Sequence, residues 1–246
     1  MTAKLWIAMT AVFLLAGLVK GVIGMGLPTV AMGLLALALP PAEAAAILVV
    51  PSLVTNVWQL LAGSRFTALA RRLWPMMLGV TAGTVAGAGI LAGDASRMAE
   101  IGLAIALMVY AIVGLTGLKL IVTARHEAWL APTVGVVTGL VTGATGVFVI
   151  PAVPYLQAIG LEKDELIQAL GLSFTVSTVA LAIGLWRVEA WQTQSVGLSV
   201  LALVPALAGM QVGQVVRRRI APSGFRTVFF AGLLLLGLYL VLRGLA

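Results

Sequence analysis

Two apolar segments of this 246-residue chain are too long for a single helix that crosses a membrane once. They cover residues near 5–38 and 128–159. As one straight helix at about 1.5 Å per residue, the first would be about 51 Å long. The hydrocarbon core of a bilayer is only about 30 Å thick. Both segments also contain glycines followed by a proline, in "GVIGMGLP" and "GATGVFVIP", so we expect a helix break in each.

The whole chain has the composition of a membrane protein. It is 61% hydrophobic and 9% charged, with a mean hydropathy of +1.14. Soluble domains carry about a quarter charged residues. Six further apolar segments have roughly the length of one crossing: 44–62, 73–92, 98–120, 166–186, 191–213 and 224–244. We therefore predict an all-α integral membrane protein. Cysteine is absent, which excludes disulfides.

An internal repeat appears when the sequence is shifted by 122 residues. A Gly-x3-Gly-x2-Gly pattern, a pair of polar residues and an arginine recur at that distance. The matched positions are Gly17 with Gly139, Gly21 with Gly143, Gly24 with Gly146, Thr55 with Ser177, Asn56 with Thr178, and Arg65 with Arg187. We interpret residues 1–122 as a first repeat and 123–246 as a second. Each repeat then has one interrupted segment and three transmembrane helices.

The orientation of the two repeats depends on whether the interrupted segments cross the membrane. If each crosses once, the repeats are parallel. The loop Lys and Arg residues then number eight on one side of the membrane and six on the other. If each is a re-entrant hairpin, the repeats are inverted. The division is then Arg65, Arg71, Arg72, Lys119, Arg125, Lys163, Arg217, Arg218, Arg219 and Arg226 against Lys4, Arg97, Arg187 and Arg243. The positive-inside rule favours the inverted repeat, with both termini outside.

The two breaks are the first candidate for a binding site. Broken backbone at membrane depth is tolerated only where protein or a cavity surrounds it. A proline suits the first turn of a new half-helix, whose free N–H groups and positive dipole end attract anions. We therefore place a substrate site between the two tips. Its residues would be Lys20, Gly21, Gly24, Gly26 and Thr29 from one tip, and Gly143, Thr145 and Gly146 from the other.

Lys20 lies inside an apolar run, where a cation is a candidate functional residue. It could bind a substrate anion. Alternatively, it could reach the membrane interface or pair with Glu43 or Glu189. Its counterpart in the second repeat is Thr142, so a cationic site would be asymmetric.

Two polar helix faces are expected to look into the bundle. One carries Ser52, Thr55, Asn56 and Gln59, at positions i, i+3, i+4 and i+7. The other carries Ser173, Ser177 and Thr178. Four of these side chains could line the substrate site, or they could form hydrogen bonds that hold the helices together: Thr55, Asn56, Ser177 and Thr178. The four-residue spacing of Gly79, Gly83 and Gly87 favours a seam of close helix packing.

The acidic residues give no catalytic constellation, because nearly all lie in predicted loops or at segment ends. We therefore expect neither an enzyme nor a cofactor or metal site, and we assign no catalytic residue. The net charge of +7 fits basic anchors that face acidic membrane lipid, not nucleic acid. Expected partners are a small anionic substrate and lipid, with a homodimer possible.

The duplicated "GLVKGVIGMGLP" and "GLVTGATGVFVIP", each followed by a polar-faced helix, resemble the TauE/SafE sulfite exporter family over about residues 8–244. The resemblance implies a multi-pass transporter in a bacterial cytoplasmic (inner) membrane. It also implies export of sulfite, sulfoacetate or other organosulfonates. Alternating access of one repeat against the other would be the mechanism. The alternatives are an importer of another small anion or organic acid, a passive channel, and a membrane assembly subunit that transports nothing.

Overall fold

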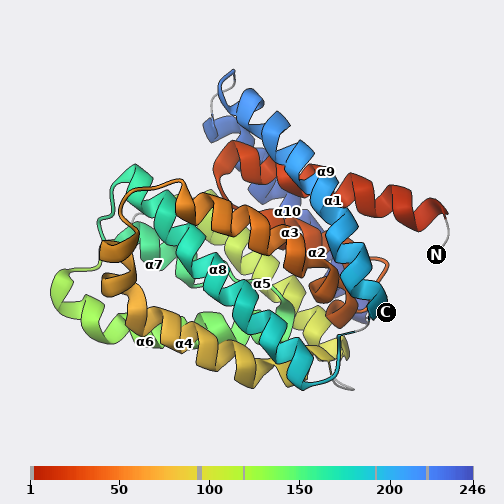
Figure 1. Cartoon of the computed structure of the whole chain (residues 1–246), viewed down its shortest axis with the longest axis horizontal. Helices are drawn as coiled ribbons and strands as arrows, with labels where there is room; N and C mark the ends of the chain where they lie inside the picture. Colours follow the sequence, from red (N-terminus) through yellow and green to blue (C-terminus); the bar gives the residue numbers. More distant parts are fainter. Residues whose placement is uncertain (1–2, 93–95, 119, 192, 220–221, 246) are drawn as a thin grey trace.

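The computed structural model describes residues 3–92, 96–118, 120–191, 193–219 and 222–245. These residues form ten helices, and there is no strand among them (Figure 1). The helices are α1 (Ala3–Ile23), α2 (Leu27–Leu35), α3 (Pro41–Leu61), α4 (Phe66–Ala92), α5 (Ser96–Thr116), α6 (Ala124–Thr145), α7 (Ala152–Ala158), α8 (Lys163–Arg187), α9 (Thr193–Arg217) and α10 (Pro222–Leu245). Eight of them, all except α2 and α7, are long and apolar enough to cross a membrane. The prediction of an all-helical membrane protein is confirmed.

Both long apolar segments break where the glycines predicted a break. The first becomes α1 and α2, and the second becomes α6 and α7. Gly24 and Gly146 end the two long helices in left-handed backbone, with φ of 78° and 71°. The Gly24 N–H donates to the carbonyl of Lys20, and the Gly146 N–H donates to that of Thr142, both at 2.8 Å. Glycine is favoured at such a helix end because it has no Cβ to strain this conformation.

The helices α6 and α7 form a hairpin whose two ends meet. The N–H of Val122, just before α6, donates to the carbonyl of Ala158 at the end of α7, at 2.8 Å. The Arg72 guanidinium on α4 binds both ends as well. It contacts Glu127 of α6 at 2.6 Å and the carbonyl of Ile159 at 2.8 Å. The chain therefore enters α6 and leaves α7 at one end of the bundle.

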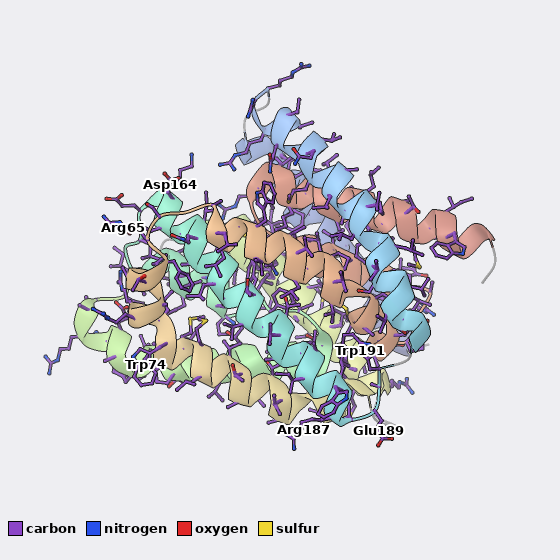
Figure 2. All side chains as sticks on the ribbon, viewed as in Figure 1. Arg65, Trp74, Asp164, Arg187, Glu189 and Trp191 are labelled. Carbon is purple, nitrogen blue, oxygen red and sulfur yellow. The ribbon has the colours of Figure 1, made fainter. Side chains whose placement is uncertain are left out.

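We call this end the arginine-rich end. It is defined by Arg65, Arg72, Lys163, Arg217 and Arg226. Figure 2 shows Arg65 and Asp164 at this end, on the left of the view. Arg187, Glu189 and Trp191 lie at the opposite end, at the lower right. These two groups of labelled residues thus lie at opposite ends of the bundle.

The helices α1 and α2 form the second hairpin, which starts and finishes at the opposite end. The helix α1 runs in the same direction as α9, since Gly209 and Gly213 of α9 face the carbonyls of Leu14 and Leu18 in that order. Just after α2, the carbonyl of Leu37 accepts a bond of 2.8 Å from Arg243 at the end of α10. Both marked chain ends lie on the right of Figure 1. The two hairpins therefore enter the bundle from opposite ends.

Each long hairpin helix packs closely against a helix of the other half of the chain. The helix α6 lies along α4, and α1 lies along α9. A Cβ on Gly83 of α4 would come within 2.4 Å of the Val136 carbonyl of α6, and one on Gly139 of α6 within 2.3 Å of the Val80 carbonyl of α4. The predicted packing seam of Gly79, Gly83 and Gly87 is confirmed. Its partner is a matching row of glycines on α6: Gly135, Gly139 and Gly143.

Candidate functional site

Lys20 is buried at one end of a hydrogen-bonded chain that joins three helices. Only 4% of its surface is exposed. Its Nζ donates to Oδ1 of Asn56 on α3. Nδ2 of Asn56 then donates to Oγ1 of Thr178 on α8, at 3.4 Å. Three of the predicted site residues, from α1, α3 and α8, are therefore brought together.

The environment of Lys20 excludes two of the readings made from the sequence. Its burial shows that it does not reach an interface, and its bond goes to Asn56 instead of Glu43 or Glu189. An ammonium group has three N–H donors. The bond to Asn56 uses one, and the described residues supply no second acceptor. The site thus holds a lysine whose hydrogen-bonding capacity is only partly met by the described residues.

Buried hydroxyl groups without a partner flank this chain. They belong to Ser52 on α3, one turn before Asn56, and to Ser177 on α8, next to Thr178. Two more are those of Thr29 on α2 and Ser173 on α8. Buried polar atoms are normally hydrogen-bonded, because an unpaired one costs about 1–3 kcal/mol. These four hydroxyls, on α2, α3 and α8, are free to bind a ligand or solvent; the other buried hydroxyls without a partner among the described residues are those of Thr84, Thr138 and Tyr155.

Other predicted site residues serve their own helices. The Thr55 hydroxyl donates to the carbonyl of Pro51 at 2.7 Å, and the Thr145 hydroxyl to that of Val141 at 2.7 Å. Gln59, on the same predicted face as Asn56, donates to the carbonyl of Ile167 at 2.8 Å. These three side chains therefore act in helix structure or helix contact as the structure stands.

The predicted glycines fall into two groups. Gly24, Gly26 and Gly146 form the breaks. Gly21 and Gly143 lie in the helix seams, where an added Cβ would come within 2.2 Å of the Met210 carbonyl and 2.4 Å of the Thr84 carbonyl. The seams leave no room for a ligand at that side of either glycine.

The two half-helices, α2 and α7, differ in where their prolines lie. Pro28 lies in the first turn of α2, as expected. Pro151 instead takes the position before the first turn of α7, which has only seven residues. The expectation that each proline opens the first turn of a half-helix is thus wrong for the second hairpin. Its break has five residues after Gly146, "VFVIP", and these carry the chain further before a helix resumes.

Sequence reasoning missed a contact at the first break. Met25 lies between the two break glycines, and its sulfur accepts a bond of 3.0 Å from the Tyr110 hydroxyl of α5. Tyr110 is 2% exposed and packs edge-on against Phe230, with ring centroids 5.1 Å apart. A buried tyrosine needs a partner for its hydroxyl, which was the available signal. The partner itself lies 85 residues away in the sequence.

The arrangement of the helices around Lys20 defines a class of protein. Membrane-length helices surround a buried cation, and half-helices interrupt the bundle, as in transporters of small solutes. The family model named Sulfite exporter TauE/SafE matches residues 9–240, so the chain belongs to the TauE/SafE family. This is a family of membrane transporters that export sulfite or related anions, and it is not a family of enzymes. Comparison with curated proteins and with solved structures gave no match.

Proposed function

We propose that this protein exports small sulfur-containing anions, such as sulfite, sulfoacetate or other organosulfonates, across a bacterial inner membrane. The observation that carries the proposal is Lys20, a buried cation with no carboxylate partner among the described residues. A lysine at membrane depth costs about 2.5–3.5 kcal/mol on insertion scales. A bound anion would offset this penalty and accept the two free N–H donors. Small oxyanions have several acceptor oxygens and suit this role.

The binding site in this proposal is a revision of the one expected from sequence. Lys20 and Asn56 bind the anion directly, and Thr178 holds the Asn56 amide in place. Thr29 and Ser177 supply free hydroxyls. The break glycines let the chain turn back beside the site, whereas the seam glycines set the helix spacing.

We also propose that the hairpins are re-entrant and that the repeats are inverted. The hairpin ends support this, because one hairpin begins and ends at the arginine-rich end and the other at the opposite end. The positive-inside rule then places the arginine-rich end in the cytoplasm. Alternating access would let the site face each side in turn, with one repeat moving against the other. A monoanion that leaves the cell down a potential of about 100 mV gains about 2.3 kcal/mol, so no coupling ion is required.

The role of Lys20 can be tested with the purified protein in proteoliposomes. Lys20→Gln keeps a donor for Asn56 but removes the charge. Hydrogen bonds to charged groups contribute about 1.5–3 kcal/mol, so we expect sulfite or sulfoacetate affinity to fall about tenfold to 150-fold. The matched control is Thr142→Val, at the position that corresponds to Lys20 in the second repeat. The Thr142 hydroxyl donates to its own helix at Thr138, so this variant should retain the parent affinity.

Two outcomes would contradict the proposal. Unchanged affinity and flux in Lys20→Gln, with a normal melting temperature, would remove Lys20 from the site. If no sulfur-containing anion stabilises the parent protein or crosses the membrane, the export function itself is wrong. An assembly subunit would give this second result.

The orientation is tested separately with reporters fused to each terminus in cells. Alkaline phosphatase is active only outside the cytoplasm, so both fusions should be active, whereas fluorescent protein fusions should be dark. A cytoplasmic N-terminus would contradict the inverted arrangement.

A further inference from the structure

A large cavity at the arginine-rich end has no place in the site described so far. It lies between α5, α7 and α10 and the ends of α1 and α9, with a volume of about 840 Å³. Pockets for organic ligands measure about 300–1,000 Å³. Sulfite, a four-atom ion, would leave most of this space empty. The size of the cavity therefore fits a larger molecule.

The charges on the cavity wall all have one sign. Lys163, Arg217 and Arg226 line it, and no Asp or Glu is among its described lining residues. Among the part of the chain that the structure describes, none of these three cations forms an ion pair. Arg226 is oriented by the protein itself, because its guanidinium lies 5.5 Å from the centre of the Phe230 ring and donates to the Gly114 carbonyl at 3.4 Å. The cations are thus available to an anionic group.

Most of the rest of the wall is apolar, and it leads inward to both helix breaks. Val22 and Ile23 come from α1, and Val113 comes from α5. Met25 of the first break and Ile150 of the second also line the cavity. A surface of this kind favours a ligand with a carbon skeleton, because burial of each CH₂ group is favourable.

We propose that this cavity is a vestibule that binds amphiphilic organic anions, with the anionic group at Lys163, Arg217 and Arg226 and the carbon skeleton on the apolar walls. The inference rests on the proposed export function and narrows its substrate class. The vestibule selects organosulfonates with a hydrocarbon part over sulfite, before the anion reaches Lys20. Met25 lies five residues beyond Lys20 in the chain, so the inner wall of the vestibule is formed by the same hairpin that carries the buried cation.

Affinity along a homologous series tests the apolar walls. The purified full-length protein is titrated with methanesulfonate, butanesulfonate and hexanesulfonate, with sulfite as reference. Each added methylene should strengthen binding about fourfold until the cavity is filled. Affinity that does not change with chain length would overturn the proposal.

Charge variants test the rim of the vestibule, by which we mean the three cations Lys163, Arg217 and Arg226. Arg217→Gln and Arg226→Gln should each weaken hexanesulfonate binding about threefold to tenfold. Arg187→Gln is the matched control, since Arg187 is an exposed arginine at the opposite end. Unchanged hexanesulfonate affinity in an Arg217→Gln/Arg226→Gln double variant with normal melting would overturn the proposal.

An anionic phospholipid could supply the same chemistry, and nanodiscs distinguish the two sources. Hexanesulfonate should bind equally well in phosphatidylcholine and in phosphatidylglycerol discs. Strong competition by phosphatidylglycerol, lost in the double variant, would assign the cavity to lipid and overturn the proposal.

The vestibule and the export function can fail independently. If sulfite export depends on Lys20 while hexanesulfonate binding ignores the rim arginines, the vestibule is wrong and the exporter stands. If rim-dependent hexanesulfonate binding occurs without flux of any sulfur-containing anion, the exporter is wrong and the cavity is a binding site only.

Discussion

The seam between α4 and α6 gives a quantitative test of the fold through Gly83→Ala. A Cβ at this position would lie 2.4 Å from the Val136 carbonyl oxygen, 2.8 Å from the Leu140 nitrogen and 3.0 Å from the Gly139 Cα. Ordinary contacts of a Cβ are 3.4–4 Å long. All three neighbours are backbone atoms, so no side chain can rotate away. The helices must separate by about 1 Å, and overpacking of this kind costs about 1–3 kcal/mol.

Gly89→Ala is the matched control on the same helix. A Cβ at Gly89 would meet nothing within 4 Å, so the variant should be neutral or gain up to about 1 kcal/mol from helix propensity. The free energy of unfolding is measured for both variants and the parent by titration with denaturing detergent in mixed micelles. We expect Gly83→Ala to be the less stable of the two by about 1–4 kcal/mol. Equal stability of the two variants would refute the close packing of α4 on α6.

Two further substitutions test polar contacts at the arginine-rich end. The Gln168 carboxamide is 1% exposed, donates to the Leu60 carbonyl at 2.8 Å and accepts from the Arg65 N–H at 2.9 Å. Gln168→Leu should therefore lower the free energy of unfolding by about 1–3 kcal/mol. The control is Gln211→Leu, at an exposed position, which should leave the free energy of unfolding unchanged. Equal effects of the two changes would contradict the contact. Arg72→Gln should lower the free energy of unfolding by about 1 kcal/mol more than the same change at the neighbouring exposed Arg71. The reason is that Arg72 binds Glu127 and the carbonyl of Ile159 after α7. Equal melting of the two variants would count against this link.

Local sequence chemistry predicted the elements of the fold closely. Apolar length located the membrane helices, and the breaks fell at Gly24 and Gly146, where backbone of positive φ requires glycine. The four-residue glycine spacing on α4 also predicted a seam correctly. These signals work because helix formation, helix ends and close approach depend on a few neighbouring residues.

Partners were harder to predict than elements. The spacing of Gly79, Gly83 and Gly87 indicated a close approach but not the helix that approaches. The answer was the glycine row on α6, of which Gly143 had been assigned to the substrate site. Gly21 and Gly143 likewise proved to be seam residues. Many apolar helices could satisfy such a pattern, and only their arrangement in three dimensions selects one.

The sequence by itself determined that this is a helical membrane protein of the TauE/SafE family, with a lysine at a depth where charge is costly. Composition and short motifs suffice for that, because lipid excludes unpaired backbone and charge wherever the chain goes. Only the tertiary structure decided that Lys20 binds Asn56, 36 positions away, and that Asn56 binds Thr178, a further 122 positions away. It alone also showed the cavity with Arg217 and Arg226. Such contacts depend on how distant helices pack, and no local pattern encodes that.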